Sequence, residues 1–190
     1  MKRPQLIIIG GAKGSGKTTL AQEFVALENY VYLGADDIAH ELNSENPEKA
    51  AIEAARIFIK RFGELLEKSE SLIVESTLSG LSLHKWIEKG RKLNFIVKIL
   101  FIYLPSPELC VQRIASRVTK GGHSVPEVDI KRRFPRANHN FWHVYKDLAD
   151  EWSLFYNAGD NIFQVAGGDR IGEIILDEAR FEEWKEMVKR

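Results

Sequence analysis

The segment from residue 11 to residue 18 constrains the fold of this chain most strongly, because it matches the phosphate-binding loop pattern G-x-x-x-x-G-K-[ST]. An apolar run that suits a buried strand precedes it at 6–9, and a run that suits a helix follows it at 19–25. Glycines let backbone N–H groups close around phosphate oxygens, and the start of the helix adds its positive dipole end. The segment therefore predicts a nucleoside triphosphate site rather than a plain glycine turn.

The individual loop residues have expected roles in holding the nucleotide. Lys17 is predicted to reach the β- and γ-phosphates, and Thr18 is predicted to place its hydroxyl on Mg²⁺. The guanine-reading motif of GTPases is missing, since its nearest match at 119–122 lacks the Asp, and this favours ATP. The nucleotide-binding residues predicted from this segment are Gly11, Ala12, Lys13, Gly14, Ser15, Gly16, Lys17, Thr18 and Thr19.

Composition limits the function classes. The 190 residues are most economically a single domain, 1–190, and Lys plus Arg equals Asp plus Glu at 27 each. Such a balance gives no overall field that would favour nucleic acid or an anionic membrane. The single cysteine excludes an internal disulfide, and the N-terminal apolar run is too short for a signal peptide. We expect a cytoplasmic protein with neither a nucleic-acid nor a membrane partner.

Strand and helix signals alternate along the chain. Strands are expected near 5–10, 30–34, 71–75, 95–104 and 161–166, and the segment 173–177 suits either a strand or a helix. Helices are expected from Asn46-Pro47 to before Ser69, after Pro107, after Pro126 and at the C-terminus, with Pro135 interrupting the third of these. The alternation predicts an α/β fold of three layers, a parallel sheet with helices on both faces.

Two of the expected strands end on carboxylates, which should face the ligand crevice of an open α/β sheet. After the second strand, Asp36 is predicted to accept the proton of an attacking hydroxyl, with Asp37 as a helix cap or an outer contact of the metal. The alternative is that both only cap a helix beginning at Ile38. Glu75 is predicted to bind a polar substrate together with Thr77; as alternatives, it is an ordinary strand-end charge or the carboxylate that holds the metal's water shell.

A basic segment interrupts the otherwise balanced charge. Residues 113–136 contain seven basic and two acidic side chains, a net charge of +5, with a glycine pair at 121–122 that could act as a hinge. This pattern predicts a lid, over approximately 117–137, that closes on the transferring phosphates. The alternative is a solvated basic surface. The basic residues are Arg113, Arg117, Lys120, Lys131, Arg132, Arg133 and Arg136.

Four motifs in the same order give the chain a family resemblance. It resembles the small bacterial zeta-toxin-like kinases at residues 10–20, 35–39, 75–80 and 117–127. The resemblance implies a five-stranded parallel sheet of order 2-3-1-4-5 and transfer of phosphate from ATP to UDP-N-acetylglucosamine. The stretch 117–123 is also similar to the lid entry of gluconate kinases.

The resemblance also implies roles for particular residues. Lys17 and Thr18 would hold ATP and Mg²⁺, and Asp36 would be the base. Glu75 and Thr77 would touch the substrate, and the loop that contains Asn157 would line the adenine. Arginines would clamp the phosphates: Arg113 and Arg117 on the nucleotide, Arg132 and Arg133 on the substrate, with Arg117 and Arg133 in catalytic roles.

These patterns favour an ATP-dependent kinase whose acceptor is a nucleotide sugar such as UDP-N-acetylglucosamine. A kinase for a free sugar, a sugar acid or a nucleotide is the alternative among enzymes. From another class, a nucleotide-binding switch with weak ATPase activity would explain the loop but would need no hydroxyl-activating base. An antitoxin protein is a further possible partner.

Overall fold

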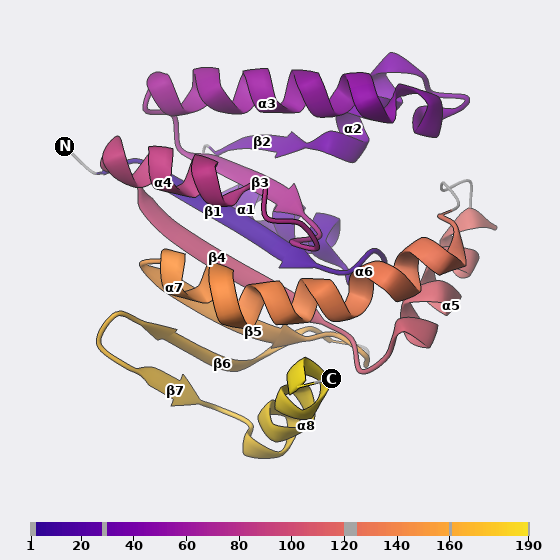
Figure 1. Cartoon of the computed structure of the whole chain (residues 1–190), viewed down its shortest axis with the longest axis vertical. Helices are drawn as coiled ribbons and strands as arrows, with labels where there is room; N and C mark the ends of the chain where they lie inside the picture. The colour runs from indigo at the N-terminus through magenta and orange to yellow at the C-terminus, as the bar shows by residue number, and fades with distance from the viewer. Residues whose placement is uncertain (1–2, 28–29, 120–124, 160, 190) are drawn as a thin grey trace.

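The computed structural model describes residues 3–27, 30–119, 125–159 and 161–189, which form a seven-stranded sheet with helices on both faces (Figure 1). The strand order is β2-β3-β1-β4-β5-β6-β7. The strands are β1 (Gln5–Gly11), β2 (Val31–Gly34), β3 (Leu72–Ser76), β4 (Ile96–Tyr103), β5 (Glu151–Tyr156), β6 (Phe163–Asp169) and β7 (Glu173–Ile175).

The first five strands are parallel and follow the expected order 2-3-1-4-5, but the expectation of five strands is wrong. Two antiparallel strands, β6 and β7, extend the sheet beyond β5. The fifth parallel strand is Glu151–Tyr156, which the sequence pattern missed, and the segment expected there, 161–166, belongs to antiparallel β6. Strand β5 pairs parallel with β4 and buries Trp152 and Leu154, whereas β6 pairs antiparallel with β5 and buries Val165 and Ala166.

The helices form two unequal layers on the sheet. On one face α1 packs against Ile7 and Ile9 of β1, and on the other α3, α4, α6 and α8 pack against a larger core around Leu6 and Ile8. The helices are α1 (Lys17–Leu27), α2 (Ala35–Leu42), α3 (Ala51–Glu67), α4 (His84–Lys92), α5 (Pro107–Val118), α6 (Glu127–Asn140), α7 (Lys146–Leu148) and α8 (Glu178–Lys189), with a 3₁₀ turn at Pro47–Ala50 and a π-helical turn at Phe141–Tyr145. No helix in these ranges combines the length and apolar character that crossing a bilayer requires.

The expectation that Pro135 interrupts the helix after Arg133 is also wrong. Helix α6 runs through Pro135 to Asn140 and continues through the π-helical turn into α7, as Figure 1 shows. Buried contacts hold this run on the sheet; the ring of Phe141, for example, stacks on Phe101 of β4 with centroids 4.4 Å apart. Packing of this kind offsets the hydrogen bond that a proline removes from a helix.

Candidate active site

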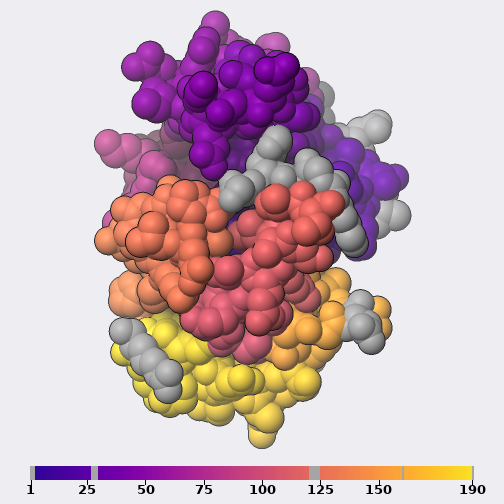
Figure 2. All heavy atoms as spheres, turned by 90° about the vertical axis from the view of Figure 1, so that its right-hand side faces the viewer, coloured from indigo at the N-terminus to yellow at the C-terminus, as the bar shows by residue number. Residues whose placement is uncertain are grey.

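The phosphate loop, α2 and the end of β3 meet at the carboxyl edge of the parallel strands. The parallel register places Glu75 of β3 between Ile9 of β1 and Gly34 of β2. In Figure 2 this edge faces the viewer, with α2 in purple above α5 and α6 in red and orange. Because open α/β sheets bind ligands at this edge, it is the candidate site.

The phosphate loop has the geometry of an anion cradle. Gly11 and Gly16 have φ values of 142° and 99°, and a Cβ on Gly16 would lie 2.4 Å from Nδ2 of Asn157. The same Asn157 amide donates to the Ser15 carbonyl over 2.8 Å, so in this structure the residue supports the loop from behind. The Ser15 hydroxyl is buried and finds no hydrogen-bond partner among the described residues. An unpartnered buried hydroxyl beside glycine N–H groups fits the phosphates of a nucleotide.

Lys17 and Thr18, at the start of α1, both contact Glu75. The Lys17 ammonium lies 3.7 Å from Oε1 of Glu75 and donates to the Ala12 carbonyl over 3.1 Å. Burial lowers the pKa of Lys17, while the Glu75 carboxylate opposes that change. The Thr18 hydroxyl donates to Oε2 of Glu75 over 2.9 Å. This arrangement presents a hydroxyl and a carboxylate together, which suits Mg²⁺, a cation that takes one or two protein oxygens and fills its other positions with waters and phosphates.

Tyr32 is a site residue that the sequence pattern did not indicate. Its hydroxyl lies 2.8 Å from Oδ2 of Asp37 and 2.9 Å from Oε2 of Glu75. Burial and the two neighbouring carboxylates raise the pKa of this phenol, so it stays protonated and donates. Its place on β2, two residues before the strand ends at Gly34, is the only sequence signal that could have suggested it.

Asp36 lies at the mouth of the loop, where its carboxylate pairs with the Lys13 ammonium. Desolvation raises the pKa of Asp36, but the charges of Lys13, Lys17 and Arg117 outweigh it and hold that pKa below the ordinary value. The alternative that both aspartates cap a helix beginning at Ile38 is wrong. Helix α2 begins at Ala35, so Asp36 and Asp37 lie within its first turn, and neither side chain caps it.

The predicted lid arginines occupy different surroundings. Arg113 lies against the loop, since its Cβ is 3.7 Å from where a Cβ on Gly14 would sit. Arg132 instead pairs with Asp129 on its own helix at 2.5 Å, and Lys131 pairs with Glu127 at 2.7 Å. Arg133 is half-buried and Arg136 is exposed. The expected hinge at 121–122, with Lys120, lies outside the described residues.

The loop after β3 carries Thr77 and is held from the α6 side. The Thr77 hydroxyl bonds the Ser79 hydroxyl at 2.9 Å, and Leu78 is buried with a φ of 54°, a conformation that costs a non-glycine residue energy. Two side chains fix the loop: Asn140 donates to the Leu78 carbonyl over 2.9 Å and Tyr145 to the Gly80 carbonyl over 2.6 Å. Helix α6, which carries Arg132 and Arg133, and the π-helical turn after it thus also position the loop that carries Thr77.

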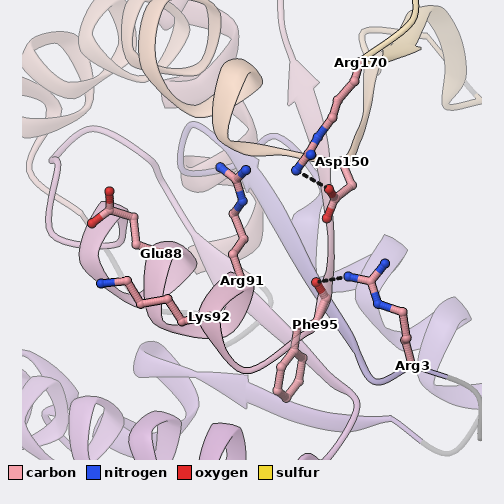
Figure 3. Close-up of a pocket in the computed structure, with 7 residues that line it drawn as sticks. All are labelled: Arg3, Glu88, Arg91, Lys92, Phe95, Asp150 and Arg170. Carbon is pink, nitrogen blue, oxygen red and sulfur yellow. Dashed lines mark hydrogen bonds and ion pairs between the residues drawn. The ribbon is translucent and has the colours of Figure 1, made fainter.

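A cavity of about 490 Å³ lies elsewhere, at the amino ends of the strands (Figure 3). Its side chains include Arg91 of α4, which points into it, and Arg170, which pairs with Asp150 at 2.5 Å. Arg3 lies beside Phe95 and donates to its carbonyl over 3.2 Å. The phosphate loop is at the opposite end of β1, so this cavity is separate from the candidate site.

Comparisons with known proteins agree with this arrangement. An uncharacterized protein of Haemophilus influenzae is 33% identical over 124 residues, which cover 65% of this chain and 88% of that protein. The structure of AvrRxo1-ORF1:-ORF2 with ATP superposes with a TM-score of 0.78 at 17% identity, and covers 95% of this chain but only 63% of the other. A structure of the PezAT chromosomal toxin-antitoxin system of Streptococcus pneumoniae gives a TM-score of 0.67 at 14% identity. That superposition covers 100% of this chain and 84% of the other.

The structural likeness shows a shared fold. The sequence itself matches the model of the family described as Zeta toxin over residues 1–157, which include the phosphate loop, Asp36, Glu75 and Asn157. This chain therefore belongs to the zeta toxin family.

Proposed function

We propose that this protein is an ATP-dependent kinase that transfers the γ-phosphoryl group to a hydroxyl of a small molecule, with a nucleotide sugar such as UDP-N-acetylglucosamine as the first choice of acceptor. The observation that carries the proposal is the meeting of Lys17, Thr18 and Glu75 at the base of the loop, with Asp36 held at its mouth by Lys13. A binding loop alone would serve a switch, but a second carboxylate beside the loop supplies a proton acceptor.

Within this proposal, the loop holds the phosphates and Thr18 holds Mg²⁺. The contacts of Glu75 with Thr18 and Lys17 favour Glu75 as the carboxylate that orders the water shell of the metal. Tyr32, by donating to Glu75, would keep that carboxylate in place. When bound, Mg²⁺ neutralises charge that develops on the transferring group. Acceptor recognition then falls more heavily on Thr77 and on the arginines of α5 and α6.

The proposed reaction is an in-line transfer. The acceptor oxygen forms a bond to the γ-phosphorus, and the bond from that phosphorus to the β–γ bridging oxygen breaks, leaving its electron pair on ADP. The acceptor proton moves to the Asp36 carboxylate, which is deprotonated at neutral pH because its pKa is held low. Lys17 and the arginines would stabilise the charge of the transition state.

Charge supports a nucleotide sugar as the acceptor. A nucleotide sugar brings its own diphosphate, which needs cations beyond those that serve ATP, and α5 and α6 carry the basic residues Arg113, Arg117 and Arg133. A kinase for a free sugar, a sugar acid or a nucleotide is the alternative. An antitoxin partner is part of the proposal, supported by the toxin-antitoxin system among the similar structures.

Mass spectrometry of the product identifies the acceptor. Purified protein with ATP and Mg²⁺ is expected to add one phosphoryl group to UDP-N-acetylglucosamine, and the added mass should lie on the sugar fragment rather than on the uridine. Free N-acetylglucosamine and gluconate serve as matched acceptors without the diphosphate. Conversion of gluconate without conversion of the nucleotide sugar would replace the first choice with the alternative.

Lys17→Ala is expected to lower turnover by about 10² to 10³-fold, because it removes a cation aimed at the transferring phosphoryl group. Steady-state kinetics with ATP as the varied substrate measures this. Lys60→Ala, which changes an exposed lysine of α3, is the control and should match the wild type. Equal activity of the two variants would remove Lys17 from the proposed mechanism.

A further inference from the structure

Strand β7 ends the sheet with an unusual edge. It pairs with β6 on one side, and no strand of the described ranges covers its other side, which lies outermost in Figure 1. Four aliphatic side chains in and beside it are exposed: Ile171 by 96%, Ile174 by 68%, Ile175 by 40% and Leu176 by 61%. Natural sheets protect an edge by keeping it short or by placing charged side chains, proline or a bulge there. Strand β7 is short, with three residues, and includes Glu173, yet it leaves these aliphatic side chains exposed. Exposed apolar surface of this kind indicates an interaction surface.

The backbone of β7 determines which groups are free. The Leu176 N–H donates to the Val165 carbonyl, and the Gly172 carbonyl accepts from the Asp169 N–H, so residues 172 and 176 face β6. Residues alternate in an antiparallel ladder, and therefore residue 174 also faces β6, whereas the N–H and C=O groups of Glu173 and Ile175 face outward. The edge thus offers two donors and two acceptors at residues 173 and 175.

These outward groups complement a second copy of themselves. We propose that two copies of this chain pair antiparallel through β7, about a two-fold axis at Ile174, so that the sheet continues from one copy into the other. In this register Glu173 of one copy exchanges both backbone hydrogen bonds with Ile175 of its partner, and the two Ile174 side chains face each other.

The free backbone groups select this register over its neighbours. A shift that keeps the outward groups paired moves the axis to residue 173 or to residue 175. An axis at 173 would set Ile175 opposite Ile171, whose N–H already donates to Oδ1 of Asp169 over 2.7 Å. An axis at 175 would set Glu173 opposite Asp177, whose N–H already donates to the Val165 carbonyl over 3.1 Å. Of the three, only the axis at Ile174 pairs free N–H groups with free C=O groups throughout.

A cysteine scan of the edge tests the register. In the proposed dimer the two residues 174 form a pair with Cβ atoms about 4.5–5.5 Å apart, which a disulfide can bridge. Residue 176 of one copy and residue 176 of its partner would be about 14 Å apart, which is too far for a disulfide. The chain has one native cysteine, Cys110, which is buried, and burial raises the pKa of its thiol to about 11, so its background reaction is low.

Mild oxidation of Ile174→Cys is expected to give a covalent dimer on a non-reducing gel at least about 10-fold faster than oxidation of Leu176→Cys, which is similarly exposed. Faster cross-linking of Glu173→Cys than of Ile174→Cys would overturn the register. Equal rates for all three would overturn the proposal.

Sedimentation velocity over a concentration series tests the dimer without cysteines. The wild type is expected to shift from monomer to dimer, whereas Ile174→Lys, which sets two ammonium groups opposite each other, should stay monomeric. At the lowest concentration of the series, where the wild type is monomeric, the tryptophan fluorescence and the melting temperature of this variant should match those of the wild type, because residue 174 is outside the core. A wild type that stays monomeric throughout would contradict the proposal and would leave the edge to a strand of another protein.

Discussion

Replacing Asp36 with Asn is expected to lower the rate of phosphoryl transfer by about 10² to 10⁴-fold, because the variant keeps the shape of the side chain but loses the proton acceptor. ATP affinity, measured by calorimetry with the non-hydrolysable analogue, should change little, since the loop itself is intact. Loss of kcat with retained binding separates a base from a binding residue.

Asp37→Asn is the matched control, on the same turn of α2. Its carboxylate lies 2.8 Å from the Tyr32 hydroxyl, whereas Lys13 pairs with Asp36, so we expect a milder loss in the same assay. If Asp37→Asn proves the more damaging change in steady-state kinetics, the roles assigned to the two aspartates are reversed.

Arg117→Ala and Arg133→Ala are expected to cost about 10³-fold in turnover if these residues act as arginine fingers on the transferring group. The charge of Arg117 already acts on Asp36 at the mouth of the loop, and Arg133 is half-buried on the helix that faces it. Single-turnover kinetics with saturating ATP would isolate the transfer step from product release.

Two neighbouring arginines give the controls. Arg136 is exposed and Arg132 is already paired with Asp129, so alanine at either position should cost little. Uniformly small losses of turnover across all four variants would indicate that the segment 113–136 is a solvated basic surface, not a lid.

The central strands were predictable because they are buried on both faces. β1, β3 and β4 appear in the sequence as continuous apolar runs, and the structure confirms them close to the expected bounds. β5 was missed because it alternates buried residues, such as Trp152, with exposed or half-buried ones, such as Glu151, and follows α7 after only two residues. Its pairing with β4 is a long-range contact that a local pattern cannot report.

The candidate site, too, was predictable only where it depends on residues close together in the sequence. The phosphate loop was predictable because its geometry depends on adjacent glycines, Lys17 and Thr18. By contrast, the contact of Tyr32 with Glu75, and the bond from Asn140 to the Leu78 carbonyl, join segments far apart in the chain. The ion pair of Arg132 with Asp129 is local, because the two residues lie three apart on α6, so it was within reach of the sequence once a helix was expected after Pro126.

Kinase activity is tested most directly by following the label of γ-labelled ATP when the purified protein is offered a small-molecule extract of cells. We expect the label to move to an organic acceptor, ADP to form only when the extract is present, and Asp36→Asn to abolish the transfer. Label found only in inorganic phosphate, at a rate that the extract and the Asp36 variant leave unchanged, would contradict a kinase and would identify a nucleotide-binding switch.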